Sequence, residues 1–377
     1  MPHVLTLVEQ FWHKVPGGTA KATERTLAAL LDRPQFTATG LSAHRRSGSS
    51  DPDPAARVPA RCRLVRHRLR RPVLYESWLR FDRPSVDSHM GANSVFWASS
   101  LIVAPCRGPV VSTVHDLDFL DHPEFLTKRG RDFFPRVWDR ALQRSDHFVC
   151  PSEVVAQQCR RHGVADAPIS VIPWGVDRPV VKSAEAAELV GSLSLSRGWD
   201  REGRRLLSLP RRFVLLVAPD QPRKNPEACA HALAETEVAA VIVGSVSEPE
   251  NDRFAPLGDA VVRLGAVTDR QLSALYHQAD ALLFPSHEEG FGLPVLEAMA
   301  HGLPVVTSRG TATEEVAGGA AVLADPNDPG DVADALGRLL SDTELRRQMI
   351  GRGWERASVL SWDRTAGLYD DVFRSVL

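Results

Sequence analysis

The stretch His287–Thr307, HEEGFGLPVLEAMAHGLPVVT, decides the fold because it places the carboxylates of Glu289 and Glu297, a glycine turn and a helix start within twenty-one residues. Glu289 and Glu297 are separated by seven residues. Between them, Gly290 and Gly292 predict a turn in which bare backbone comes close to a ligand. Glu289 lies in the loop and Glu297 in the helix that follows, so both carboxylates can face one site without being neighbours.

A helix is predicted from Pro294 to His301. Proline suits the first position of a helix, and Gly302 suits its end. Leu303–Thr307 then has the apolar, β-branched character of a short buried strand. The free N–H groups of residues 292–295 are expected to point to the same space as the two carboxylates, and such a helix start attracts phosphate.

These features predict a site for a sugar nucleotide. The backbone N–H groups suit its diphosphate, and one carboxylate suits the hydroxyl groups at each end of the ligand. The alternative is a capped helix with surface glutamates, which is the commoner meaning of a lone glutamate pair at this spacing. The residues between the two glutamates favour the ligand site.

The same stretch resembles a known family. E-G-F-G-L-P-V-L-E-A-M-A-x-G-L-P-V-V is similar, almost letter for letter, to the E-x7-E segment of the family 4 retaining glycosyltransferases, which have the GT-B fold. In that family the second glutamate binds the ribose, and the first glutamate and the backbone after it bind the donor sugar. The resemblance implies that Glu297 contacts the ribose. It implies a donor-binding loop made of Glu289, Gly290, Phe291, Gly292 and Leu293.

The composition bounds the class of protein. A chain of 377 residues is too long for one ordinary core and fits two domains. With 43% hydrophobic residues, 24% charged residues and a formal net charge of −2, the chain is typical of a globular protein. Nothing in this balance indicates disorder or a polyanionic partner, so nucleic-acid binding is not expected.

The cysteines and the N-terminal stretch bear on the compartment. The five cysteines are scattered and contain no C-x-x-C pair, which predicts buried thiols in a reducing compartment and no disulfide framework or zinc site. MPHVLTLVEQFW has no basic region and reads as a first strand, Val4–Val8, so a cytoplasmic protein is expected. The long uncharged stretch Gly91–Cys106 has sixteen residues, fewer than the ~20 needed to cross a bilayer.

Gly17 and Gly18 lie in a loop between the first strand and a helical stripe of apolar residues. Ligands of α/β sheets meet such loops at the carboxyl ends of strands. A glycine pair before a helix is more often only a turn. The family has a similar loop near the diphosphate and the acceptor, and the resemblance implies that role for Gly17 and Gly18.

Six arginines occur in the eleven residues Arg61–Arg71, RCRLVRHRLRR. One interpretation is a docking surface for an anionic membrane or a phosphorylated acceptor, which would hold the protein at the inner membrane surface. The other is a solvated strand edge and loop. We favour the second, because charge runs usually only solvate a surface.

His115 follows the compact strand Pro109–Val114, at the position where α/β proteins place catalytic groups. V-V-S-T-V-H-D-L-D-F-L resembles the family's V-x-T-x-H-D segment, whose histidine contacts the donor sugar near the reacting carbon. The resemblance implies a catalytic role for His115. Asp116 and Asp118 could instead form a metal-binding D-x-D pair, but the phosphate-binding features lie elsewhere, and no metal is expected.

A basic loop follows the strand that is predicted to begin the second sheet, Phe213–Val217. Arg223 and Lys224 in this loop suit a diphosphate leaving group, whose developing charge must be offset; on their own they would read as solvated cations. R-K-N-P resembles the family's phosphate-binding loop, with Lys224 in the lysine position. Many members have glycine in place of Ala218 and an additional arginine in place of Pro219.

Two further segments carry the resemblance. Arg263 and Leu264 belong to R-L-G-A-V, which resembles the family's segment beside the nucleotide base. Ile172–Asp177 resembles the I-P-N-G-V-D junction between domains, with Trp174 in place of the usual asparagine. We expect this tryptophan to change the lining of the site.

The fold implied by the resemblance is α/β, the GT-B fold of two doubly wound Rossmann-like domains facing each other across a cleft. Residues 1–176 are expected to bind the acceptor and residues 177–360 the nucleotide sugar. The last helix, about residues 361–377, is expected to pack back on the first domain.

The function implied is transfer of a hexose from a nucleoside-diphosphate sugar, with retention of anomeric configuration and with neither metal nor other cofactor. Glu289 as a covalent nucleophile is the less favoured form of this mechanism. The paired H-D-L and R-K-N segments look most like GDP-mannose-dependent mannosyltransferases that build cell-surface polysaccharide or glycolipid. The acceptor is then a glycan, a glycolipid or a small molecule.

Two other classes of function remain open. A nucleotide-sugar epimerase or hydrolase has the same fold and acts on the donor without an acceptor, but it usually needs additional carboxylates. A non-catalytic homologue that only binds nucleotide sugar is the other class. The presence of His115, Lys224, Glu289 and Glu297 argues against it.

Overall fold

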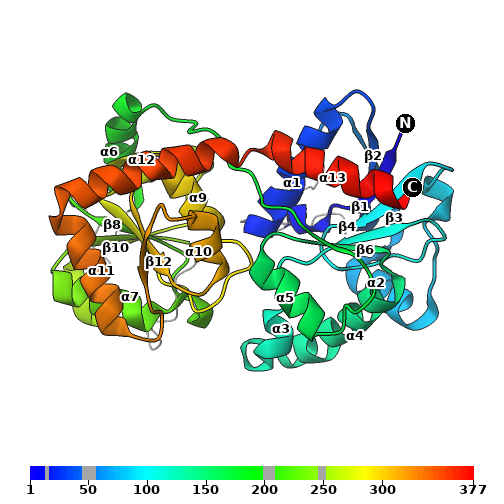
Figure 1. Cartoon of the computed structure of the whole chain (residues 1–377), viewed down its shortest axis with the longest axis horizontal. Helices are drawn as coiled ribbons and strands as arrows, with labels where there is room; N and C mark the ends of the chain where they lie inside the picture. The colour runs from blue at the N-terminus through cyan, green and yellow to red at the C-terminus, as the bar shows by residue number, and fades with distance from the viewer. Residues whose placement is uncertain (13–16, 45–56, 198–208, 245–251) are drawn as a thin grey trace. The chain divides into compact units, whose positions relative to one another are not determined.

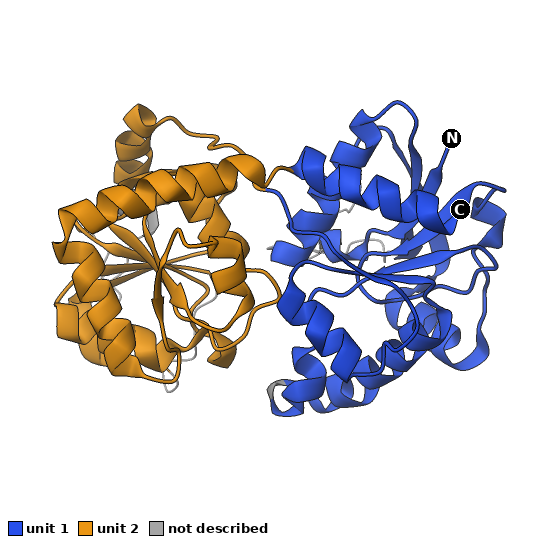
Figure 2. Ribbon diagram, in the orientation of Figure 1, with its two compact units in different colours: residues 1–175, 362–377 blue, residues 176–361 orange. Residues whose placement is uncertain are grey.

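The computed structural model describes residues 1–12, 17–44, 57–197, 209–244 and 252–377. They form two compact α/β units, each built around one parallel sheet (Figure 1). Unit 1 contains residues 1–175 and 362–377, and unit 2 contains residues 176–361 (Figure 2). The chain therefore passes from one unit to the other twice.

The sheet of unit 1 has seven strands in the order β3-β2-β1-β4-β5-β6-β7, and its paired strands are parallel. The inner strands are buried on both faces, which explains their continuous apolar and β-branched sequences. The strands are β1 (His3–Leu7), β2 (Thr37–His44), β3 (Cys62–Arg70), β4 (Ser94–Ala98), β5 (Val110–Thr113), β6 (His147–Cys150) and β7 (Ile169–Val171).

Helices cover both faces of this sheet (Figure 1). Two of them begin at a side-chain cap: the hydroxyl of Thr127 accepts from the N–H of Gly130 at the start of α4, and that of Ser152 accepts from the N–H of Val155 at the start of α5. The helices are α1 (Gly18–Asp32), α2 (Arg71–Phe81), α3 (Asp118–Asp121), α4 (Lys128–Arg144), α5 (Glu153–Arg161) and α13 (Trp362–Val376), with 3-10 turns η1 (Glu9–Trp12), η3 (Asp87–His89) and η4 (Pro123–Phe125).

Helix α13 completes the core of unit 1. It packs beside α1, although more than three hundred residues separate the two helices in sequence (Figure 1). Tyr369 and Phe373 are buried against Trp97, and the Tyr369 hydroxyl lies 2.8 Å from Oγ1 of Thr113. The structure thus places this helix where the sequence analysis put it.

The sheet of unit 2 has six parallel strands in the order β10-β9-β8-β11-β12-β13. The strand order reverses between β8 and β11, so the loops that follow these two neighbours diverge and leave room for a ligand. The strands are β8 (Val214–Val217), β9 (Ala240–Val243), β10 (Val261–Gly265), β11 (Ala281–Phe284), β12 (Val305–Ser308) and β13 (Val322–Ala324).

The helices of unit 2 agree well with the sequence. The hydroxyl of Thr268 caps α8 by accepting from the N–H of Gln271, and the Gln271 side chain accepts from the N–H of Thr268, which completes a capping box. The central helix α9 runs from Leu293 to Ala300, one residue earlier at each end than predicted. The helices are α6 (Ser183–Arg197), α7 (Pro226–Thr236), α8 (Asp269–Gln278), α9 (Leu293–Ala300), α10 (Ala312–Ala317), α11 (Pro329–Ser341) and α12 (Thr343–Val359), with η5 (Pro222–Lys224) and η7 (Ala255–Ala260).

All five cysteines are buried free thiols, as the sequence analysis predicted. In the part of the chain that the structure describes, no helix is both long and apolar enough to span a bilayer.

Candidate functional site

The loops after β8 and β11 bring three charged side chains together at the point where the strand order reverses. Arg223 Nη1 lies 2.9 Å from Glu289 Oε1, and Lys224 Nζ donates a hydrogen bond to the same oxygen. The side chains of Lys224 and Glu289 are only 9% and 8% exposed. Two residues from one loop and one from the next therefore form a buried cluster, which we call the charge cluster.

Lys224 is held by an aromatic ring as well as by the carboxylate. Its ammonium lies 4.1 Å from the centroid of the Phe284 ring, at the end of β11. Burial alone would raise the pKa of Glu289, but the positive charges of Lys224 and Arg223 and their hydrogen bonds hold it below its usual value. The carboxylate is therefore ionised at neutral pH.

Asn225 fixes the basic loop, a role that the sequence analysis did not assign. It adopts a left-handed conformation, φ 60°, and its side chain accepts from the N–H of Ala228 at the start of α7. Its amide also donates to the carbonyls of Pro285, at 3.1 Å, and Pro326, at 2.7 Å. One side chain thus ties three loops together behind Lys224. An asparagine before a proline-started helix was the available signal.

The backbone conformation of Ala218 explains why many members of the family have glycine at this position. It has φ 50°, a left-handed conformation that glycine adopts without strain. The neighbouring Gly244 is also left-handed, and a Cβ there would lie 3.0 Å from the Cα of Ala218. The turn therefore has the shape that favours glycine at both positions, and this chain places alanine at one of them.

The start of α9 was predicted to offer four N–H groups, and the structure corrects this. Pro294 has no N–H, and Val295 donates its own to the carbonyl of Gly292 at 3.0 Å. Among the described residues, no partner is seen for the N–H groups of Gly292 and Leu293, which are proposed below to meet a ligand. Gly292 has φ 97°, and a Cβ there would lie 2.7 Å from Cγ2 of Thr313, so only glycine fits this turn.

Glu297 lies on the buried face of α9 and has a partner that the sequence did not reveal. The hydroxyl of Tyr276, on α8, donates to Glu297 Oε2 at 3.0 Å. Burial and the Glu297 charge raise the pKa of Tyr276 far above its usual value, so the phenol stays protonated and keeps donating. In the sequence, Tyr276 was an ordinary apolar position of a helix.

The remaining donor-site candidates of unit 2 are enclosed. Arg263, on β10, lies 3.4 Å from Asp220 Oδ1 and donates to Asp252, and it packs over the ring of Phe254. Leu264, Phe291 and Leu293 are buried. Because their side chains are buried, these three residues can contact a ligand mainly through their backbone N–H and carbonyl groups.

His115 is in unit 1, directly after β5. Its Nε2 lies 2.7 Å from the carbonyl of Ser99, which can only accept, so Nε2 carries the proton. Burial lowers the pKa of His115 to about 4, and the ring is neutral at pH 7. Nδ1 is buried and has no hydrogen-bond partner among the described residues, so it is left as an acceptor.

Two residues of unit 1, Trp174 and Ser99, contact this histidine. Trp174, which replaces the family's asparagine, contacts the His115 ring edge-on with 5.4 Å between ring centroids. The Ser99 hydroxyl receives hydrogen bonds from Thr6 at 3.1 Å and Gln10 at 3.0 Å. Ser99 therefore links β1 to His115 through its own backbone and side chain.

Gly17 and Gly18 begin helix α1 and are exposed. Gly17 has φ −75°, and a Cβ there would meet no atom within 4 Å, so neither strain nor crowding requires glycine at this position. The preceding residues 13–16, which complete the predicted loop, lie outside the described residues.

The arginine-rich segment forms the edge strand β3 and the start of α2, and all six of its arginines are exposed. Exposure fits both the solvated strand edge that we favoured and a docking surface. For the D-x-D alternative, the described residues contain no group of three or more His, Cys, Asp or Glu side chains arranged to hold a metal ion.

The comparisons with known proteins cover both units. The chain matches the family described as Glycosyltransferase Family 4 over residues 17–178, and the family described as Glycosyl transferases group 1 over residues 202–356. It is 33% identical over 314 residues to a D-inositol 3-phosphate glycosyltransferase of Acidothermus cellulolyticus, covering 76% of this chain and 67% of the relative.

A second relative has a higher identity over a shorter segment. It is the O-antigen chain mannosyltransferase B of Escherichia coli, 43% identical over 162 residues, which are 40% of this chain and 42% of the relative. The chain spans only part of the length of such relatives, for example 22% of a serotype-specific mannosyltransferase of Escherichia coli and 70% of a mannosyltransferase of Mycolicibacterium hassiacum.

The fold also has close solved counterparts. A sucrose-phosphate synthase of Thermosynechococcus elongatus superposes with a TM-score of 0.74 at 20% identity, covering 100% of this chain and 98% of that one. At this identity the likeness concerns the fold alone. The sequence matches, together with this likeness in fold, show that the chain belongs to the family 4 glycosyltransferases of the GT-B fold.

Proposed function

We propose that this protein is a retaining hexosyltransferase that moves a hexose, preferably mannose, from a nucleoside-diphosphate sugar to a carbohydrate or glycolipid acceptor. The observation that carries the proposal is the charge cluster. Arg223 and Lys224 contact Glu289, and the loop that carries Glu289 leads within four residues into the start of α9. Two cations and a helix start at one sheet edge suit a diphosphate.

In the reaction proposed, the bond between the hexose anomeric carbon and the diphosphate oxygen breaks. A bond from that carbon to the acceptor oxygen forms on the same face of the sugar. The acceptor's proton goes to an oxygen of the departing diphosphate. Arg223, Lys224 and the N–H groups of Gly292 and Leu293 offset the charge that develops on this leaving group, so the chemistry proposed needs no metal.

The two carboxylates have different tasks. Both cations contact Oε1 of Glu289, and Oε2 is proposed to accept from a sugar hydroxyl. Glu297, oriented by Tyr276, is proposed to accept from the ribose hydroxyls. Arg263 and Leu264 are proposed to lie beside the base, and Gly17 and Gly18 beside the diphosphate and acceptor.

His115 is proposed to accept from a donor-sugar hydroxyl through Nδ1. Its proton on Nε2 is committed to Ser99, so the neutral ring cannot act as a general acid toward the sugar. This assigns the histidine to binding and orientation of the sugar at the reacting carbon.

The donor and acceptor classes rest on the relatives. Mannosyltransferase activity is named for the Escherichia coli relative, which supports mannose and, from the motifs, GDP. Polysaccharide or glycolipid synthesis at the inner membrane surface is part of the proposal. The exposed arginines of Arg61–Arg71 support contact with anionic lipid there. Co-sedimentation with phosphatidylglycerol vesicles, compared with phosphatidylcholine vesicles, tests that contact.

The first experiment is a thermal-shift screen of the full chain with GDP, UDP, ADP and their hexose conjugates. Ligand at one hundred times its Kd adds about 2.7 kcal/mol to the free energy of unfolding. Stabilisation by GDP and GDP-mannose alone supports the proposal. Stabilisation by the uridine set overturns the mannosyl assignment, and no response to any nucleotide favours a non-catalytic homologue.

Release of free nucleoside diphosphate separates the remaining classes. A transferase releases it in proportion to acceptor, whereas a hydrolase releases it from the donor alone, and an epimerase converts the sugar without releasing it. Product analysis with and without a mixed glycan acceptor pool decides among them.

A further inference from the structure

Unit 1 contains a cavity that the proposed donor chemistry does not use. Its volume is about 310 Å³, within the usual range for small-ligand sites. Strands β1, β2 and β3, helix α2 and the segment around η3 enclose it. Its walls are mainly apolar, and they include Leu7, Leu41, Leu74, Trp78 and Val86.

The cavity also has a charged mouth. The exposed lining residues are Arg66, Arg68 and Ser85, while His67 and His89 are half-buried. Burial and the neighbouring His89 lower the pKa of His67, so at pH 7 the attraction for an anion comes from the arginines. An apolar interior under a cationic mouth suits a ligand with an apolar body and an anionic end.

Ser42 gives an independent sign of a ligand. Its side chain is 1% exposed and lines the cavity, and its hydroxyl has no hydrogen-bond partner among the described residues. A buried hydroxyl without a partner costs about 1–3 kcal/mol. Ser42 pairs with Arg66 in the ladder between β2 and β3, so the hydroxyl lies near the polar end of the cavity.

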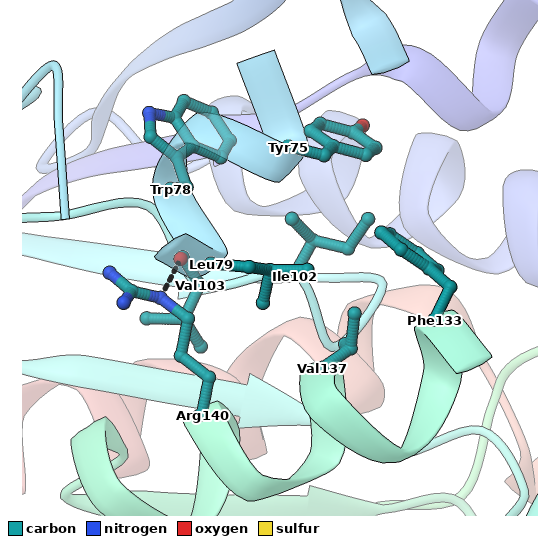
Figure 3. A pocket seen from close by; sticks show the side chains of 8 residues that line it. All are labelled: Tyr75, Trp78, Leu79, Ile102, Val103, Phe133, Val137 and Arg140. Carbon is teal, nitrogen blue, oxygen red and sulfur yellow. Dashed lines mark hydrogen bonds between the residues drawn. The ribbon is translucent and has the colours of Figure 1, made fainter. Parts of the chain in front are cut away.

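A hydrogen bond holds part of the cavity wall in place. The indole N–H of Trp78 donates to the carbonyl of Pro84 at 3.1 Å, directly before the lining residues of the η3 segment. Trp78 also lines a separate, smaller pocket with Tyr75 and Phe133, in which Arg140 of α4 donates to the carbonyl of Val103 at 2.7 Å (Figure 3). A pre-formed wall lowers the entropy cost of binding.

Hydrogen bonds connect the cavity to His115. The carbonyl of Leu7, whose side chain lines the cavity, accepts from the Ser99 hydroxyl at 3.2 Å. The carbonyl of Ser99 accepts from His115 at 2.7 Å. The cavity therefore lies in the same unit as the proposed sugar-orienting histidine, and Ser99 links that histidine to a residue of the cavity wall.

We infer that this cavity binds a lipid phosphate, with the hydrocarbon chain against Leu41, Leu74 and Trp78 and the phosphate at Arg66 and Arg68. A phosphoester oxygen of the same ligand would then meet the Ser42 hydroxyl. Only the further role of this lipid as the glycosyl acceptor rests on the proposed function.

Binding is measured by calorimetry on the full chain without any donor, with n-dodecyl phosphate as the probe below its micellar concentration. Arg68→Gln removes one cation from the mouth, and Val65→Trp fills part of the cavity from the edge strand. Arg63→Gln is the matched control, because Arg63 is exposed on the same strand and does not line the cavity.

We expect Arg68→Gln and Val65→Trp each to weaken binding by about tenfold or more, and Arg63→Gln to change it by less than twofold. Equal affinity for dodecyl maltoside would overturn the phosphate contact. Equal affinity for inorganic phosphate would overturn the role of the hydrocarbon chain. Unchanged binding by both folded cavity variants would overturn the site.

The two proposals fail separately. A protein that binds dodecyl phosphate but transfers no hexose contradicts the proposed function alone. A protein that transfers hexose but binds dodecyl phosphate no better than the Val65→Trp variant contradicts the cavity assignment alone.

Discussion

At the scale of single residues, the charge cluster ties stability to turnover. Lys224 and Glu289 are buried together, so removing one charge leaves the other poorly compensated. We expect Lys224→Met to lower turnover by about 10²-fold or more and the free energy of unfolding by up to about 3 kcal/mol. Urea unfolding and a donor-turnover assay measure the two effects.

A double variant separates these effects. Lys224→Met with Glu289→Gln removes both charges of the pair, so we expect it to recover part of the stability and none of the activity. Turnover near the wild-type rate in Lys224→Met would contradict the assignment of the leaving-group site.

The pKa of His115 gives a prediction about pH. In the folded protein it is about 4, below the ordinary value of ~6.5. Between these values the unfolded chain binds a proton that the folded protein does not, so stability falls as pH drops from about 6.5 to about 4, by up to about 3 kcal/mol. We expect His115→Gln to make the free energy of unfolding fall less steeply with decreasing pH, by the amount that corresponds to one bound proton. Urea unfolding at a series of pH values from 7 to 4.5 measures this slope. An unchanged slope would show that His115 titrates normally.

At the scale of elements, the turn after β8 carries a removable strain. Ala218 has φ 50°, which costs an L-residue about 1–2 kcal/mol. We expect Ala218→Gly to raise the free energy of unfolding by about 1 kcal/mol. Ala234→Gly is the control, because Ala234 is exposed within α7, where glycine costs about 0.5–1 kcal/mol. Equal effects of the two changes, measured by urea unfolding, would contradict the prediction.

Most elements could be predicted from the sequence, because their signals are local. The Thr268 cap, the strand before the central motif and the glycine at the start of α9 each depend on residues within one turn. Helix α12 was not predicted; it lies between two elements that were. Its sequence spreads apolar residues around the helix and buries only Met349 and Gly353, so it has no clear stripe.

The candidate site was only partly predictable for a different reason. Arg223, Lys224, Glu289 and Glu297 stood out by residue type and by the resemblance. Their partners did not: Tyr276 meets Glu297 only once α8 packs on α9, and the orienting carbonyl of Ser99 belongs to no motif. Contacts between elements decide these pairs, and one sequence does not encode them locally.

At the scale of the whole molecule, the two units should respond separately to damage. Phe373, on α13, is fully buried in the core of unit 1. We expect Phe373→Ala to lower the stability of that unit by about 3–5 kcal/mol. Hydrogen exchange should quicken in α1 and β4 while β8 and β11 stay protected. Val359→Ala, at a 49% exposed position on α12, is the control and should change neither unit. Equal loss of protection in both units would show that they unfold as one.

The double passage of the chain between the units also sets an order of assembly on the ribosome. Residues 176–361 are contiguous, so unit 2 can finish folding as soon as they emerge. Unit 1 begins first but stays unfinished until α13 emerges, because Tyr369 and Phe373 fill its core. During that interval the nascent chain exposes the apolar surface around Trp97 and α1. The unit whose translation begins earlier is therefore the unit whose core is completed later.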